Sequence, residues 1–170
     1  LEPVGSRRLY RFPSFFSELS NTDSHSISSL ACGHRIIAVS NLDDESQRVN
    51  ASSSQGPTRD GRYKPEIAAP GTNVVAANGF SHPDEPWISM SGTSMASPYV
   101  AGVVALMFEA NPGLSAAQCA GILLRTARPL PGASYEWGND VGYGRINPTA
   151  AIEGGKRANG RTEVRPRGKR

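Results

Sequence analysis

The sequence of 170 residues predicts an α/β fold. Three observations favour it: short β-branched runs lie in the first half, two helical patterns follow them, and loops rich in glycine and proline separate these segments. With glycine counted and tyrosine left out, about 45% of the residues are apolar, the usual share in globular proteins. A generically disordered chain is therefore excluded, and no apolar run reaches the roughly 20 residues that span a bilayer.

Three short runs are the expected strands. Residues 36–39 read Ile-Ile-Ala-Val, and such a β-branched, nearly continuous run is typical of a buried parallel strand. Residues 74–77 and 88–90 are the two further strands that we expect. Between the first two runs, the Gly-Pro and Asp-Gly pairs within residues 52–61 predict a loop.

A long helix is expected after the last strand. Apolar residues make up 22 of the 36 residues from 95 to 130, which marks this stretch as core. Between residues 97 and 110 only Ser97 and Glu109 are overtly polar, so the pattern predicts a helix that is buried on every face. Pro98 then falls in the first turn, where no intrahelical hydrogen bond is lost.

Two shorter elements complete the prediction. Ser115 is expected to cap a second helix that ends near Thr126, before an Arg-Pro pair. A glycine-rich turn at residues 142–145 is followed by a short apolar element at residues 146–152. Strands followed by helices, with loops between them, predict layers of helix and sheet.

The net charge of +3 is very unevenly distributed. Residues 156–170 hold seven basic residues and one acidic residue, whereas residues 1–154 carry a net charge of −3. A charged, glycine-rich tail with few apolar residues cannot offset its ordering entropy, so we expect it to be disordered. Contact of this tail with nucleic acid is the alternative, and a solvated chain end is the interpretation that we favour.

The stretch from residue 91 to residue 98, Ser-Gly-Thr-Ser-Met-Ala-Ser-Pro, lies between a predicted strand and the long helix. A hydroxyl at the N-terminus of a buried helix is close to free backbone N–H groups, and the helix dipole stabilises negative charge there. Such a place suits the oxyanion of acyl transfer, which makes Ser94 a candidate nucleophile. Spacing alone favours the other interpretation, in which Ser94 is an ordinary N-cap.

Three segments carry a resemblance to a known family. Residues 92–102, Gly-Thr-Ser-Met-Ala-Ser-Pro-Tyr-Val-Ala-Gly, resemble the nucleophile motif of the subtilisin-like serine proteases. Residues 53–61 and 64–71 are similar to the Ser-Ser-x-Gly-Pro and Lys-Pro-Asp/Glu-x-x-Ala-Pro-Gly stretch of these enzymes. Residues 142–147 resemble the closing turn of their catalytic domain. The motifs stand in the family's order, and the resemblance covers roughly residues 20–153.

The resemblance implies an organisation for the whole chain. It implies the C-terminal part of a three-layer subtilisin-like fold, with a mostly parallel sheet and a buried central helix that starts at the nucleophile. We accordingly expect a partial peptidase domain at residues 21–154. Residues 1–20 form an unassigned N-terminal stretch, and residues 155–170 form the basic, disordered tail.

The resemblance also implies a serine endopeptidase that hydrolyses peptide bonds through an acyl-enzyme. Ser94 would attack the carbonyl, a His would remove its proton, and an Asp would orient that His. The family places Asp and His ahead of Ser, but no Gly-His-Gly-Thr-His or Asp-Ser/Thr-Gly motif precedes Ser94. The histidines present, His25, His34 and His82, are interpreted as surface or strand-end residues. We therefore expect the N-terminal half of the catalytic domain, lying outside this chain, to supply both residues.

An oxyanion-hole residue is the second site prediction. In the family, the N–H of the nucleophile is joined by the side-chain amide of an Asn ahead of the buried strand. Asn21 is the only Asn before residues 36–39, so it is our candidate, although the surrounding Glu-Leu-Ser-Asn-Thr departs from the family's small residues and glycine. Tyr99 also departs from the family, which more often has His at that position.

No cofactor is expected. Structural calcium is common in the family, but Asp43, Asp44 and Glu45 are interpreted as a solvated acidic turn because hard cations need six or more oxygens in a shaped loop. The two cysteines, Cys32 and Cys119, make neither a disulfide framework nor a four-ligand metal site.

The partners and the location follow from the resemblance. A polypeptide is the expected substrate, with unknown substrate-binding residues, and the N-terminal half of the domain is the expected protein partner. Neither nucleic acid nor a membrane span is expected, and the family's habit predicts a secreted or cell-envelope protein. The alternative function is a catalytically inactive truncated or pseudoenzyme fragment that acts as an interaction module, in which Ser94 is only a cap.

Overall fold

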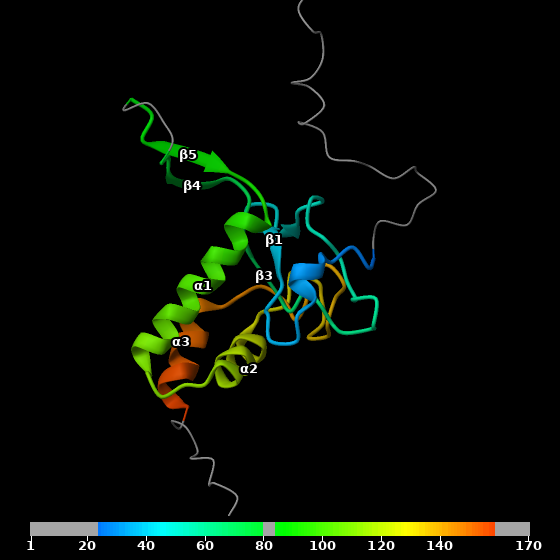
Figure 1. Ribbon diagram of the computed structural model, residues 1–170, viewed down its shortest axis with the longest axis vertical. Helices are drawn as coiled ribbons and strands as arrows, with labels where there is room; N and C mark the ends of the chain where they lie inside the picture. The colour runs from blue at the N-terminus through cyan, green and yellow to red at the C-terminus, as the bar shows by residue number, and fades with distance from the viewer. Residues whose placement is uncertain (1–23, 80–83, 159–170) are drawn as a thin grey trace, which may run out of the picture.

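The computed structural model describes residues 24–79 and 84–158 of the chain. The expectations for residues 1–20 and for the tail beyond residue 158 therefore lie outside the described residues. The elements, shown in Figure 1, are in chain order η1 (Ser29–Cys32), β1 (Val39–Asp43), β2 (Arg48–Val49), β3 (Ile67–Pro70), β4 (Val74–Ala77), β5 (Trp87–Met90), α1 (Thr93–Ala110), α2 (Ala116–Thr126) and α3 (Pro148–Arg157). Helices and strands both contribute, so the α/β class is confirmed.

The central sheet has the strand order β2-β1-β3. Strands β1 and β3 run parallel, with Val39 opposite Ile67 and Leu42 opposite Pro70, whereas the short β2 pairs antiparallel with the end of β1. A single parallel bridge from Ala68 to Arg145 continues the sheet beyond β3. The parallel part of the described sheet is thus the pair β1–β3 and this bridge.

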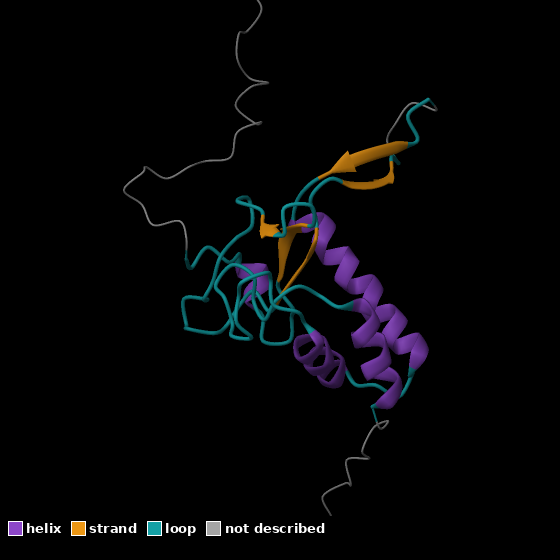
Figure 2. Cartoon of the chain, turned by 180° about the vertical axis from the view of Figure 1, so that it is seen from behind, coloured by secondary structure: helices purple, strands orange, loops and turns teal. Residues whose placement is uncertain are grey.

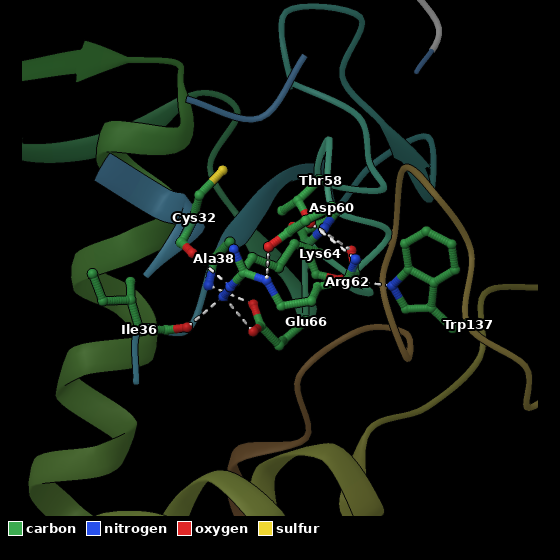
Figure 3. Close-up of polar contacts among 10 residues, drawn as sticks. Cys32, Ile36, Ala38, Thr58, Asp60, Arg62, Lys64, Glu66 and Trp137 are labelled. Atoms are coloured by element: carbon green, nitrogen blue, oxygen red, sulfur yellow. Dashed lines mark hydrogen bonds and ion pairs between the residues drawn. The ribbon is translucent and has the colours of Figure 1, made fainter. Parts of the chain in front are cut away.

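Strand β1 begins at Val39, whereas the sequence placed a strand at residues 36–39, so that prediction was wrong by about three residues. The reason is that Pro65 faces this segment and has no N–H to donate to a ladder. Side chains replace the ladder: Lys64 Nζ donates to the carbonyl of Ile36 at 2.7 Å, and the N–H of Ala38 donates to Glu66 Oε2 at 2.7 Å (Figure 3).

Lys64 and Glu66 also form an ion pair, with 2.5 Å between Nζ and Oε1. The Lys64 side chain is 3% exposed, so this charge is held in the interior by two contacts, with the Glu66 carboxylate and the Ile36 carbonyl, instead of by water. In the neighbouring loop, Arg62 donates to the carbonyl of Cys32 at 2.6 Å and pairs with Asp60 at 2.8 Å (Figure 3). Polar side chains therefore fasten the start of β1 and the η1 turn to the loop before β3.

Strand β3 was not predicted, because prolines at positions 65 and 70 made its Ile-Ala-Ala core look like part of a loop. Its three apolar residues are fully buried, and its proline is the last residue of the strand. A proline at a strand end removes no ladder bond on which the sheet depends. Strand β4 falls at the predicted residues, and β5 begins one residue earlier than predicted.

Helix α1 begins at Thr93, one residue before the start that the resemblance implied and four before the start of the apolar pattern, and it ends at the predicted Ala110. Pro98 is therefore the sixth helical residue and not a first-turn residue, and its missing N–H leaves the carbonyl of Ser94 without the usual intrahelical donor. The early start has a cause in Gly92, the N-cap, whose φ of 154° is open to glycine but not to other residues.

Only one face of α1 is buried in the described chain. The buried residues are Ala96, Val100, Val103 and Met107, which recur at the helical spacing of three or four. Away from this stripe, Tyr99 and Leu106 are exposed on one side of the helix and Phe108 on the other, Leu106 by 49%. The prediction that this helix is buried on every face is thus wrong for the described chain, because no described element covers the second face.

The two remaining helices follow α1 in the chain. Ser115 caps α2 through a capping box with Gln118, as predicted for this helix, which ends at the expected Thr126. The short apolar element expected at residues 146–152 is the first part of α3, which continues to Arg157 and so reaches three residues into the predicted tail. Asn147 caps α3 by accepting from the N–H of Ala150 at 3.3 Å.

The layers are built on α1. This helix lies over one face of the β1–β3 pair, α3 packs across α1, and α2 packs against α3 (Figures 1 and 2). On the other face of the sheet lie loops, one of which accepts a hydrogen bond from Ser40 through the carbonyl of Asp140. The hairpin β4–β5 forms a separate two-stranded sheet and projects from the body beside the start of α1 (Figure 2).

Candidate active site

Ser94 is the second residue of α1 and is exposed at the point where the hairpin, the sheet and the helix meet. The N-cap is Gly92, so the interpretation of Ser94 as an ordinary N-cap is wrong. Within residues 24–79 and 84–158, the Ser94 hydroxyl has no hydrogen-bond partner. A side chain with no capping duty, exposed at a helix start, is available for chemistry.

The start of α1 also offers backbone donors. The carbonyl of Gly92 accepts from the N–H groups of Met95 and Ala96, at 3.0 and 3.3 Å. The N–H of Ser94 itself has no acceptor among the described residues. Since this N–H lies at the positive end of an 18-residue helix dipole, it can donate to an oxygen on which negative charge develops.

The turn that carries Ser94 is anchored to the end of β3. The N–H of Gly92 donates to the carbonyl of Gly71 at 2.7 Å, and the N–H of Gly71 donates to the carbonyl of Leu42 at 3.1 Å. A Cβ at Gly71 would lie 2.7 Å from the Gly92 carbonyl and 2.9 Å from the Ala96 side chain. Only glycine fits this contact, so the position of the Ser94 turn follows directly from that of β3.

The hairpin is closed at its base next to the same turn. Ser91 Oγ accepts from the N–H of Asn73 at 2.8 Å, which joins the residues just before β4 and just after β5. Asn73 itself has a φ of 54°, in the left-handed region that asparagine tolerates. The base of the hairpin beside Ser94 is therefore held by a contact within this chain.

The described histidines do not reach Ser94 in a catalytic arrangement. His34 lies on a groove of about 630 Å³ together with Val104 and Phe108. These helical residues are about 15 to 20 Å along the axis from Ser94, at a rise of about 1.5 Å per residue. His25 is exposed, and its ring Nδ1 lies 3.0 Å from the hydroxyl of the neighbouring Ser24. The reading of both as surface residues agrees with this placement.

Two predicted or considered residues cannot be placed. Asn21, the oxyanion-hole candidate, and His82 lie outside the described residues. Asn21 therefore stays a prediction for the second donor of the oxyanion hole, beside the Ser94 N–H.

The acidic residues at 43–45 form a turn that is satisfied internally. Asp43 accepts from the Ser46 hydroxyl at 2.8 Å and from the N–H of Glu45 at 3.1 Å, contacts that hold its pKa below the usual value. Asp44 forms an ion pair with Arg145 at 2.8 Å. Across the described ranges, no group of three or more His, Cys, Asp or Glu side chains is placed to hold a metal ion.

Residues that sequence reasoning missed include Asn41, in β1, which has a fully buried side chain beside Gly71. Its Nδ2 is a buried donor with no partner in the described chain. The sequence indicated Gly71 only as the last residue of the motif at residues 64–71. No sequence signal singled out Asn41, which directly follows the apolar run at residues 36–39 and Ser40, and the proline next to Gly71 hid the strand that precedes it.

Comparison with known proteins gives consistent matches. The chain is 37% identical over 112 residues to the serine protease AprX of Bacillus subtilis strain 168, a match that covers 56% of this chain and 25% of AprX. It is 38% identical over 132 residues to the halolysin-like extracellular serine protease Nep of Natrialba magadii, covering 78% of this chain and 22% of Nep. The chain thus spans about a quarter of the length of these relatives.

Solved structures agree with the fold. The CspB protease of Clostridium perfringens matches 80% of this chain and 30% of its own, with a TM-score of 0.68 and 26% identity. The prenylagaramide maturation protease PagA matches 79% of this chain and 47% of its own, with a TM-score of 0.61 and 26% identity. A sequence model described as the subtilase family matches residues 14–147. With most of its length matched in this way, the chain belongs to the subtilase family.

Proposed function

We propose that this chain is the nucleophile-bearing part of a serine endopeptidase, and that a separate N-terminal part of the catalytic domain supplies the triad Asp and His. The observation that carries the proposal is Ser94 at the start of α1, whose hydroxyl and N–H have no hydrogen-bond partner among the described residues. AprX and Nep, to which the chain is similar, are named serine proteases. Their much greater lengths leave room for the residues that this chain does not contain.

The chemistry follows from the groups at the start of α1. Ser94 Oγ attacks the carbonyl carbon of the scissile peptide as a base from the N-terminal part takes its proton. The carbonyl oxygen becomes an oxyanion and accepts from the Ser94 N–H, with the Asn21 amide as the proposed second donor. The C–N bond then breaks, the leaving amine takes the proton, and water later releases the acyl group from Ser94.

The exposed apolar surface supports a partner that covers it. We use the name uncovered face for the outward side of α1 with the hairpin β4–β5. Its exposed members include Tyr99 and Leu106 on the helix and Val75, Trp87 and Met90 on the hairpin, with Trp87 68% exposed. Large contiguous apolar areas of this kind mark interaction sites. An isolated two-stranded hairpin is also marginally stable in water, so it gains from being covered.

Two further features support the same kind of partner: an open strand edge and an apolar groove. Strand β2 pairs only with Leu42 and Asp43, so the edge of β1 at Val39 has no strand neighbour in the described chain. An apolar groove of about 630 Å³, lined by Ile36, Val104, Phe108 and others, opens beside it. An open strand edge and an apolar groove are what a sheet and helices from the other part of the domain would bury.

The substrate and location are part of the proposal. A polypeptide is the substrate that peptide-bond hydrolysis requires. Nep and the Bacillus subtilis protease Vpr are named extracellular, which supports secretion of this protein as well. Among the described residues, none of the helices combines the length and the apolar character needed to cross a membrane.

The test uses a joined domain, in which this chain follows the part of the AprX catalytic domain that precedes their matching region. We expect the joined domain to hydrolyse an unfolded protein such as casein, and the chain alone to be inactive. Ser94→Ala should abolish the activity, whereas Ser97→Ala, which removes an exposed hydroxyl three residues further along α1, should retain it.

The outcome separates the proposal from its alternative. A folded joined domain in which Ser94→Ala changes nothing would support a non-catalytic interaction module. Hydrolysis by the chain alone, lost on Ser94→Ala, would contradict the need for a separate N-terminal part.

A further inference from the structure

We infer that Asn41 is a positioning residue for Ser94, one that holds the turn at the start of α1 through Gly71. The inference rests on the proposed role of Ser94 as nucleophile. Asn41 lies in β1 and is 0% exposed, between Ser40, whose buried hydroxyl has a hydrogen-bond acceptor, and the buried Leu42. A polar side chain in such a place needs a reason, because it gives up hydration that an apolar residue would not lose.

The orientation of the Asn41 side chain follows from a chain of directional hydrogen bonds. Asn50 Oδ1 accepts from the backbone N–H of Ser52 at 3.0 Å, so Asn50 Nδ2 is the group that donates to Thr72 Oγ1 at 3.3 Å. The Thr72 hydroxyl accepts that bond and donates its single proton to Asn41 Oδ1 at 3.1 Å. Asn41 therefore faces Thr72 with its oxygen, and Nδ2 is the end without a partner.

The backbone of Asn41 is fixed as firmly as its side chain. Its N–H donates to Ser53 Oγ at 3.1 Å, and its carbonyl accepts from the N–H of Asn50 at 2.8 Å. These two contacts hold Asn41 to residues 50–53, and the bond from Thr72 adds a third contact, to the segment after β3. The carboxamide is thus a fixed support and not a mobile side chain.

This support lies directly against the turn of the nucleophile. The Cβ that Gly71 lacks would lie 2.6 Å from Asn41 Oδ1 and 2.7 Å from the carbonyl of Gly92. Gly71 thus sits between the Asn41 carboxamide and the Gly92 turn, and its carbonyl holds the N–H of Gly92. Ser94 follows Gly92 by two residues, so a shift of Asn41 is passed on to the attacking oxygen.

The unpaired Nδ2 sharpens the inference. A buried donor with no acceptor destabilises a folded protein, and an apolar side chain of similar size avoids that penalty. A residue kept only for stability would therefore be better replaced by leucine at this position. Positioning of Ser94 accounts for an asparagine that stability alone disfavours, in the way that active sites commonly give up stability for geometry.

The test compares activity with stability in the joined domain. For Asn41→Leu we expect the second-order rate of Ser94 labelling by a fluorophosphonate, and kcat on a peptide substrate, to fall roughly 10- to 100-fold. KM should change less than about twofold, since no substrate contact is removed. The melting temperature should change little, because removal of the orphan donor offsets the loss of the bond from the Thr72 hydroxyl.

Ser40→Ala is the matched control. Ser40 is the neighbouring residue of β1, is equally buried, points to the other face and donates to the carbonyl of Asp140. Its loss should lower the melting temperature and leave the labelling rate of the folded protein unchanged.

A second pair keeps the inference testable if Asn41→Leu does not fold. Thr72→Val removes the hydroxyl that orients Asn41 and should slow labelling, whereas Thr72→Ser keeps a hydroxyl and should restore it. Wild-type labelling rates in both Asn41→Leu and Thr72→Val would overturn the positioning role. If the unsubstituted joined domain folds and Ser94 is not labelled, the proposed function fails first, and the two failures are distinguishable.

Discussion

The two sides of α1 differ in how completely the rest of the chain covers their apolar side chains. On the packed side, which comprises β1, β3, α2, α3 and the buried stripe of α1, apolar residues pack together, and Asn41 Nδ2 is the one buried side-chain polar atom of the described residues without a partner. On the uncovered face, side chains of the same apolar character meet solvent, as at Leu106 and Trp87. Ser94 lies where the two regions join. The packed side fixes the position of the nucleophile, and the uncovered face marks where its catalytic partners are expected.

The largest expected effect probes the packed side through its interior ion pair. In the joined domain, Glu66→Gln leaves the Lys64 ammonium, 3% exposed, without its carboxylate, and should lower the free energy of unfolding by about 3 to 5 kcal/mol. Urea denaturation measures this change.

The matched control is the pair of Glu153 and Lys156, which has a similar distance of 2.7 Å but is half exposed. Glu153→Gln should cost less than about 1 kcal/mol. Equal effects of the two substitutions would remove the distinction between an interior and a surface pair.

The next effect tests the junction at Gly71. Gly71→Val places atoms within 3 Å of Asn41, the Gly92 carbonyl and Ala96, and should destabilise the joined domain by about 3 kcal/mol. Ser94 labelling of the remaining folded protein should also slow. Gly79→Ala is the control, because nothing lies within 4 Å of the added methyl group. Full labelling of the folded Gly71→Val protein would show that the turn does not depend on this contact.

The comparison of the two faces is tested most directly at Leu106. In the joined domain Leu106→Ala should cost about 2 to 3 kcal/mol, as for a buried leucine. In the chain alone the same change should stay within about 0.5 kcal/mol, because the side chain is already exposed. Val103→Ala, on the buried stripe, should destabilise both forms. A Leu106→Ala effect that is the same in both forms would mean that the joined part does not cover this face.

The smallest expected effect is a pH dependence of stability that comes from Asp60, in the loop before β3. The hydrogen bond from the Thr58 hydroxyl, with help from Arg62, lowers the pKa of Asp60 to about 2. A lowered folded-state pKa contributes stability above the ordinary value near 4, and this contribution is lost as the pH falls toward 2. Asp60→Asn should therefore flatten the fall of stability between about pH 4 and pH 2, measured by thermal unfolding. If Asp60→Asn leaves the fall of stability in this pH range unchanged, Asp60 does not contribute to it.

The sequence predicted the elements whose signals are local. The cap at Ser115 follows from a residue type favoured at helix starts, the end of α2 from the Arg-Pro pair beyond it, and β4 from a β-branched run. The starts of β1 and α1 were misplaced because they depend on distant partners. Lys64 and Glu66 replace a ladder beside Pro65, and Gly92 begins the helix because the carbonyl of Gly71 holds it.

For the site, the motif identified Ser94, and the structure shows it free at the start of a helix. Asn41 could not be predicted, because its importance lies in a contact with Gly71, 30 residues away in the chain. The prediction that α1 is buried on every face came from composition. Composition shows that the helix surface is apolar, but it does not show which segment covers that surface.

The most direct test of the account is the site of the covalent adduct formed by a fluorophosphonate. In the joined domain, peptide mapping should place the adduct on Ser94, and the chain alone should carry none. An adduct on the isolated chain, or a folded joined domain without an adduct on Ser94, would contradict the account.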